Sequence, residues 1–167
     1  MSVAQHRARS PRSVACFVLT ISDTRTLETE TSGRAIADLL VAAGHTVVGR
    51  TVVKDEPADV RRAVTDAMNA GTAQAVITTG GTGLARRDST YEALTAIFEK
   101  RLDGFGELFR MLSFEEIGAA AMLSRATAGV AGGCALFLLP GSEAAVRLAM
   151  DRLILPELGH IVGELGK

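Results

Sequence analysis

The chain is poor in aromatic residues and carries almost no net charge. Of its 167 residues 4% are aromatic, one is tyrosine and none is tryptophan. Hydrophobic residues still make up 47%, so we expect one sizeable core built mainly from Ala, Val, Leu and Ile in a single domain. The formal net charge of −1 argues against a general nucleic-acid binder and against a membrane-surface binder.

Cysteines and long apolar runs are scarce as well. Cys16 and Cys134 lie within apolar runs without metal-type spacing, so both are predicted to be buried structural thiols. No apolar stretch approaches the roughly 20 residues of a membrane span, and the first residues lack a signal-peptide core. The sequence therefore predicts a cytoplasmic protein with no membrane partner. The three histidines show no pairing pattern, which argues against a Cys/His metal site.

Residues 1–13 differ from the rest of the chain. Arg7, Arg9 and Arg12 make this segment a polar, basic arm. Because nothing apolar in it could anchor it, we expect a flexible arm, with nucleic-acid contact as the alternative. Residues 14–167 are expected to form one domain.

Short β-branched runs alternate with helical patterns, which is typical of an α/β fold. Pro57 and Gly44 mark a helix start and a helix stop. The final helical stretch is open to a break at Pro156. This order of elements predicts a three-layer α/β/α sandwich with a mostly parallel sheet. Strands are expected at 14–21, 46–53, 75–79 and 135–139, and helices at 31–43, 57–70, from 89, at 104–118 and after 142.

Most of the functional information lies in residues 75–92. A short apolar strand leads into Gly80-Gly81-Thr82-Gly83, and a helix start with a Ser-x-x-Glu capping box follows at Ser89. Glycines let the backbone approach a ligand, and a strand that leads through glycines to a helix often binds an anion. The segment lacks the lysine of a phosphate-binding P-loop and the third glycine of a dinucleotide site. It therefore predicts a phosphorylated ligand, with a tight structural turn as the alternative.

Two carboxylates follow strand ends, Asp55 and Asp88. Two such groups beside a phosphate would suit Mg²⁺, which prefers oxygen ligands and bridges to substrate phosphates. Each has a structural alternative. Asp55 could complement the dipole of the helix after it, and Asp88 could cap one.

Polar groups also follow the other predicted strands. In open α/β sheets ligands bind outside the carboxyl ends of the strands, so these segments are expected to converge. Ser142 could cap the last long helix and hold an anion at once. Arginines suit phosphate because they donate two parallel hydrogen bonds, although most surface arginines are merely solvated. The strand-end segments are 22–25, 54–56, 80–88 and 140–142, and the candidate arginines are Arg25, Arg86, Arg87 and Arg125.

Taken together, these motifs resemble the molybdenum-cofactor biosynthesis family that includes MoaB and MogA, and the stretch 104–118 is most similar to the MoaB branch. Two residues depart from the family pattern, Glu30 in place of Asp and Tyr91 in place of Pro. The motifs occur in family order as Thr20–Arg25, Ser32-Gly33, Gly44-His45, Lys54–Glu56, Thr78–Gly83, Arg87-Asp88-x-Thr90-x-Glu92-Ala93, Leu123–Ala126 and Leu139–Ser142.

The resemblance implies a trimer or a hexamer that binds molybdopterin and adenylylates it with ATP and Mg²⁺, releasing pyrophosphate. It implies that Asp55 and Asp88 are the catalytic and metal-binding aspartates. Possible partners are other proteins of molybdenum cofactor biosynthesis. A non-catalytic molybdopterin carrier and an oligomeric scaffold are the alternatives. The binding residues that it implies are Ser22, Asp23, Thr79, Gly80, Gly81, Thr82, Gly83, Arg87, Ser124, Arg125, Pro140, Gly141 and Ser142.

Overall fold

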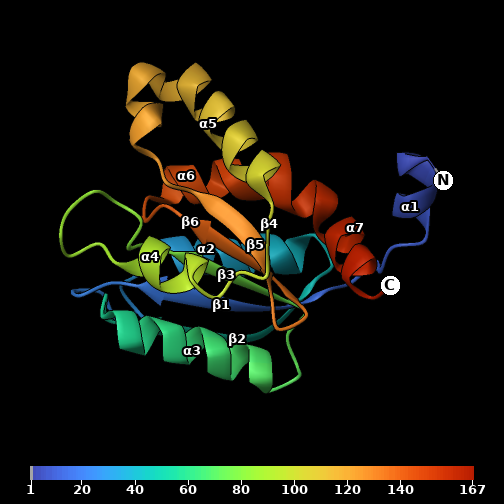
Figure 1. Cartoon of the computed structure of the whole chain (residues 1–167), viewed down its shortest axis with the longest axis horizontal. Coiled ribbons are helices and arrows are strands. Elements are labelled where there is room, and N and C mark those ends of the chain that lie inside the picture. The colour runs from blue at the N-terminus through green and yellow to red at the C-terminus, as the bar shows by residue number, and fades with distance from the viewer. Residues whose placement is uncertain (1) are drawn as a thin grey trace.

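The computed structural model describes residues 2–167, which form one six-stranded sheet between two layers of helices (Figure 1). The strand order is β2-β1-β3-β6-β5-β4. The first four strands in this order are parallel, and β5 and β4 extend the sheet in antiparallel fashion. The predicted three-layer α/β/α fold is confirmed. The strands are β1 (Ala15–Ile21), β2 (Thr46–Val53), β3 (Ala75–Thr79), β4 (Lys100–Arg101), β5 (Thr127–Ala131) and β6 (Cys134–Leu139).

The helices begin and end close to the predicted signals. Pro57 opens the third helix, and glycines with positive φ, Gly44 and Gly71, follow the second and third. Ser142 caps the sixth by accepting a hydrogen bond from Ala145 N. The helices are α1 (Val3–Ala8), α2 (Ser32–Ala42), α3 (Pro57–Asn69), α4 (Thr90–Thr95), α5 (Asp103–Ile117), α6 (Glu143–Ala149) and α7 (Leu155–Leu165). Two further turns are a 3₁₀ segment, η1 (Gly118–Leu123), and a π segment, η2 (Met150–Ile154).

Alternation along the central strands divides the core between the two faces of the sheet. In β3, Ala75 and Ile77 pack with α2, α5, α6 and α7, whereas Val76 packs on the opposite face with α3 and α4. Because both faces are covered, the whole of β3 is buried, including the two threonines at its end, Thr78 and Thr79. Both cysteines are buried free thiols, as predicted, and burial raises the pKa of Cys16 to about 12.

Two features of the sheet were not predicted. β5 and β4 were missed because β5 is a short Thr-Ala-Gly-Val-Ala run and β4 has two residues. Gly132 and Gly133, with φ of 55° and 75°, make the tight turn between β5 and β6. That glycine pair is the signal that could have revealed the hairpin.

The final helical stretch is not interrupted at Pro156. Helix α6 passes through the π segment into α7, and Pro156 lies in the first turn of α7. Proline is tolerated there because the preceding π segment already departs from the regular helical hydrogen-bond pattern, with the Leu155 N–H bonded to Met150 O. No helix among residues 2–167 is long and apolar enough to cross a membrane.

The N-terminal arm also differs from the expected flexible tail, because Val3–Ala8 form helix α1 beside α7 (Figure 1). Ser2 and Gln5 form a capping box at its start. Its attachment is polar rather than apolar. His6 contacts Glu164, and Arg7 forms an ion pair with Glu157. Charged groups on α7 thus contact the basic residues of the arm.

Leu40 and Val41 are neighbours on α2 with opposite environments, the first fully buried and the second 63% exposed. We expect Leu40→Ala to lower the free energy of unfolding by about 2–5 kcal/mol, because it leaves a cavity in the core. Val41→Ala, the matched control, should change it by about 0.5 kcal/mol or less. Urea unfolding measures both, and equal effects would contradict the assignment of this core.

Candidate active site

A cleft of about 800 Å³ lies at the carboxyl ends of β1, β3 and β6. The strand order reverses here, since β1 has β2 on one side and β3 on the other. This is the switch point at which open α/β sheets bind ligands. Of the predicted site residues, Ser22, Thr79, Gly80, Gly81, Thr82, Gly83, Asp88, Ser124, Pro140, Gly141 and Ser142 line the cleft.

The loop after β3 has a backbone that only glycine accommodates. Gly80 and Gly81 have φ of 101° and 69°, and a Cβ on Gly80 would lie 2.2 Å from the carbonyl oxygen of Ile21. The N–H of Gly80 donates to Leu139 O at 3.0 Å, which ties the loop to β6. Within residues 2–167 the N–H groups of Gly81, Thr82 and Gly83 have no protein acceptor. All three residues line the cleft, so their N–H groups are candidate donors for an anion there.

The starts of two helices also line the cleft. Ser32 opens α2, and Ser142 caps α6. The hydroxyl of Ser32 donates to Gly141 O at 2.8 Å, so it joins the two helix starts. Helix N-termini carry partial positive charge, which favours a negatively charged ligand here.

Asp55 is buried behind the glycine loop rather than in the wall of the cleft. Its Oδ1 accepts from both the backbone N and the hydroxyl of Ser89, at 3.3 and 2.8 Å. The predicted capping box at Ser89 is therefore wrong, because the Ser89 side chain donates to Asp55 instead of capping α4. The second carboxylate oxygen of Asp55 lies beside Gly81.

Asp88 lies on the cleft side of the same loop. Its Oδ2 accepts from the N–H of Ala85 at 3.1 Å, which closes the turn before α4. A Cβ on Gly83 would lie 2.5 Å from this oxygen, so the missing side chain leaves room for the carboxylate. Asp88 thus has both a local structural contact and access to the cleft.

The groups around the loop have the chemistry of a magnesium site. Thr90 Oγ1 is the one buried side-chain polar atom of residues 2–167 without a hydrogen-bond partner. A Cβ on Gly81 would lie 2.0 Å from this hydroxyl and 2.9 Å from Asp55 Oδ2. The space that Gly81 leaves is therefore bordered by two oxygens, and Asp88 lies further along the loop. Oxygen donors of this kind fit Mg²⁺.

Arg87 links the loop to two strand ends instead of lining the cleft. Its guanidinium donates to both carboxylate oxygens of Asp23, at 2.9 and 3.0 Å, and forms an ion pair with Glu56 at 2.7 Å. The hydrogen bonds from Arg87 hold the pKa of Asp23 below its usual range. Asp23 in turn accepts from the N–H of Asp55 at 3.1 Å. Neither Asp23 nor Arg87 borders the cleft, although both position residues that surround it.

Arg125 holds the glycine loop from outside the cleft. It donates to Thr82 O at 3.0 Å and to Gly83 O, and it pairs with Glu92. Its guanidinium carbon lies 4.8 Å from the centre of the Tyr91 ring. The guanidinium therefore donates its hydrogen bonds to the carbonyl groups of the glycine loop.

Several cleft residues were not predicted as site residues. Glu30, which is 2% exposed, accepts from the Thr20 hydroxyl and the Gly33 N–H and pairs with Arg50. The sequence signal that could have identified Glu30 as a site residue is its departure from the family pattern, in which Asp is usual at this position. The packing of α5 over the cleft could not be read from local sequence. Other unpredicted lining residues include Thr31, Ser32, Phe109, Ser113, Ile117, Leu123 and Glu143.

Residues 17–160 match the model of a family described as probable molybdopterin binding domain, and the chain belongs to this family. Among curated relatives, molybdenum cofactor biosynthesis protein B of Halalkalibacterium halodurans is 51% identical over 100% of this chain and 99% of its own length. The Bacillus subtilis protein of the same name is 50% identical over 100% of this chain and 99% of its own length.

Solved structures agree with this membership. A crystal structure of molybdenum cofactor biosynthesis protein B superposes with a TM-score of 0.91, at 50% identity over 95% of this chain and 99% of that chain. The tungsten cofactor synthesizing protein MoaB from Pyrococcus furiosus superposes with a TM-score of 0.87. Its sequence is 36% identical, and the match covers 95% of this chain and 100% of that chain.

Gly80 offers a test of the loop backbone. We expect Gly80→Ala to lower the free energy of unfolding by about 2–3 kcal/mol, because the new Cβ meets the Ile21 carbonyl at a positive φ. Gly104→Ala is the matched control, since a Cβ there meets nothing within 4 Å, and it should be neutral or stabilising by up to about 1 kcal/mol. Thermal and urea unfolding measure both, and a neutral Gly80→Ala would refute this loop geometry.

The Asp23–Arg87 pair predicts a defined pH response. Because the folded pKa of Asp23 is lowered, the pair contributes above the unfolded pKa, about 3.9, and is lost as pH falls through the folded value. We expect Arg87→Gln to raise the Asp23 pKa toward its ordinary range. The control Arg86→Gln should leave it unchanged. Carboxyl-carbon NMR during a pH titration measures the shift, and an Asp23 pKa insensitive to Arg87→Gln would contradict the pairing.

Proposed function

We propose that this protein acts in molybdenum cofactor biosynthesis as a molybdopterin adenylyltransferase. An oxygen of the molybdopterin phosphate would attack the α-phosphorus of ATP, forming the new P–O bond as the bond to pyrophosphate breaks. The single observation that carries the proposal is the set of free N–H groups on the glycine loop, beside two aspartates and two helix N-termini. Membership of the molybdopterin-binding family identifies the class of ligand.

The residues of the cleft have distinct parts in this reaction. The Gly81, Thr82 and Gly83 N–H groups would bind phosphate oxygens and stabilise charge that develops during transfer. The helix starts at Ser32 and Ser142 would attract the negatively charged substrates.

Asp55, Asp88 and Thr90 would hold Mg²⁺, which neutralises phosphate charge and orients the leaving group. Ser89 keeps Asp55 in one orientation through its two hydrogen bonds. Asp23, Arg87 and Arg125 act indirectly, since they position the loop and the aspartates.

A homotrimer or homohexamer is part of the same proposal. Helix α5 and the turn after it expose large apolar side chains, which is unusual for a surface that faces water alone. Phe114 and Ile117 are each 61% exposed, and Met122 is 75% exposed. A second copy of the chain would cover them. We place the reaction in the cytoplasm, where ATP is available, with other cofactor-biosynthesis proteins as possible partners.

A non-catalytic carrier of molybdopterin is the second candidate. Asp55 and Asp88 both make structural hydrogen bonds, and these contacts favour a carrier because both aspartates could be retained for loop stability alone. The carrier and the enzyme share the cleft and differ in turnover, so one assay separates them.

The test is formation of adenylyl-molybdopterin and pyrophosphate from molybdopterin, ATP and Mg²⁺ by the purified protein. We expect Asp88→Asn and Asp55→Asn to lower turnover by about 10²–10³-fold, because charge neutralisation at the phosphates is weakened. Asp59→Asn, on α3 and outside the cleft, is the matched control and should retain activity.

The binding of molybdopterin to the same proteins is measured by calorimetry alongside the assay. If the unchanged protein binds molybdopterin but forms no adenylyl-molybdopterin, the enzyme proposal is wrong and the carrier is supported. Absence of any binding to molybdopterin or ATP would reject both and leave the oligomeric scaffold.

A further inference from the structure

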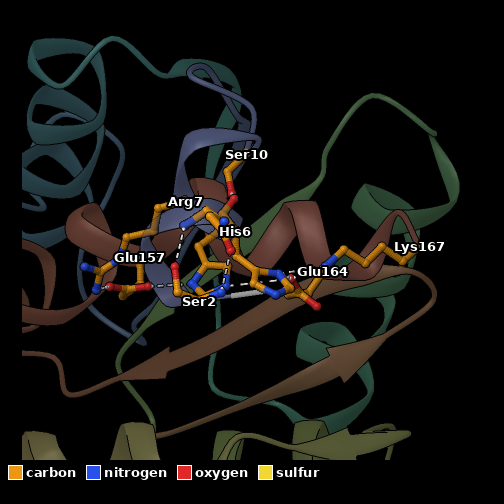
Figure 2. A network of polar contacts seen from close by, with 9 residues as sticks. Ser2, His6, Arg7, Ser10, Glu157, Glu164 and Lys167 are labelled. Carbon is orange, nitrogen blue, oxygen red and sulfur yellow. Dashed lines mark hydrogen bonds and ion pairs between the residues drawn. The ribbon is translucent and has the colours of Figure 1, made fainter.

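The two ends of the chain meet at a cluster of imidazoles and carboxylates (Figure 2). His6 comes from α1, whereas His160 and Glu164 lie one turn apart on α7. Glu164 Oε1 is 2.7 Å from His6 Nδ1 and 3.7 Å from His160 Nε2. Within residues 2–167 this is the one trio of His, Cys, Asp or Glu residues whose possible ligand atoms all lie within 4.8 Å of one another.

His160 is oriented by a second carboxylate. Its Nδ1 lies 2.9 Å from Glu157 Oε2, which leaves Nε2 directed at Glu164. A carboxylate on one imidazole nitrogen is the common support for a metal on the other, because it fixes the tautomer and raises ligand basicity. Glu157 is itself paired with Arg7.

Lys167 already places a positive charge in the cluster. Its Nζ is 2.9 Å from His6 Nδ1 and 2.5 Å from Glu164 Oε1 (Figure 2). An ammonium group only donates, so His6 Nδ1 must offer its lone pair to it and cannot donate to Glu164 at the same time. The His6 lone pair and the Glu164 carboxylate therefore face one cation. Lys167 is half-exposed, so another cation can displace it.

We propose that His6, His160 and Glu164 bind one Zn²⁺ ion, with water as the fourth ligand. Two imidazoles and a carboxylate suit zinc, whereas Mg²⁺ prefers oxygen donors alone. Tetrahedral zinc places its ligand atoms about 3.3 Å apart. The observed distances to Glu164 Oε1 are 2.7 and 3.7 Å, and all three ligand atoms lie within 4.8 Å of one another, so side-chain adjustments would bring them around one ion.

The surroundings favour ligand binding. The imidazoles are about three-quarters buried, with 24% and 23% of their side chains exposed.

Zinc at this site would fasten the N-terminal helix to the C-terminal helix. One ligand comes from α1 and two from α7, so the order of the arm would depend on the metal. The site lies on the opposite side of the molecule from the loop after β3 (Figure 1). It is therefore independent of the adenylyltransferase proposal.

The experiment is calorimetric titration of ZnCl₂ into the full-length, metal-stripped protein without an affinity tag. Excess Mg²⁺ is included to occupy oxygen-only sites. We expect one zinc per chain. His6→Ala and His160→Ala should each weaken binding by more than about 100-fold, and Glu157→Gln by about 10- to 100-fold. His45→Gln, which alters the histidine outside the cluster, is the matched control and should bind normally.

Trypsin digestion tests directly whether zinc holds helix α1 against α7. Zinc should slow cleavage after Arg7, Arg9 and Arg12 in the unchanged protein but not in His6→Ala. His6 lies outside the two core clusters, so this variant is expected to fold. Equal zinc affinity in His6→Ala and the unchanged protein, or no one-per-chain site, would overturn the proposal.

Discussion

The cleft depends on the parallel alignment of β1, β3 and β6, which ends three strands at one edge of the sheet. This alignment brings Gly80 against the Ile21 carbonyl, where a Cβ would clash, and allows its N–H to bond Leu139 O. The chain must therefore turn sharply where β3 ends. The same turn leaves the following N–H groups without protein acceptors, so the fold itself produces the anion-binding feature.

Charged side chains then hold this turn from both sides. Asp55 fixes Ser89 at the end of the loop, and Arg125 fixes the carbonyls of Thr82 and Gly83 at its start. Arg87 connects the middle of the loop to Asp23 and Glu56. Each contact crosses between elements far apart in sequence. A loop held in this way keeps its donors in place before a ligand arrives, which lowers the entropic cost of binding.

The sequence predicted those helices and strands whose limits depend on interactions between residues close together in the chain. The limits of β2 and β3, the Pro57 helix start and the Ser142 cap all follow from periodicity or from single-residue conformational preferences. The β5–β6 hairpin was missed because β5, a short Thr-Ala-Gly-Val-Ala run, carries a weak apolar pattern, although β6 was predicted. The Ser89 capping box was wrong because Asp55, from another strand end, competes for the same hydroxyl. Local capping rules cannot include a partner supplied by the tertiary fold.

The histidines illustrate the same limit at longer range. Along the chain His6 and His160 are 154 positions apart and show no ligand spacing. The pairing arises because α7 presents carboxylates that face a basic arm, so charge attraction contributes to docking α1. Once α1 is docked, imidazoles from both ends share Glu164. The attraction that holds the arm against α7 thus also brings metal-binding atoms together. The orientation of both His6 and Glu164 toward the Lys167 ammonium distinguishes this cluster from ordinary surface ion pairs.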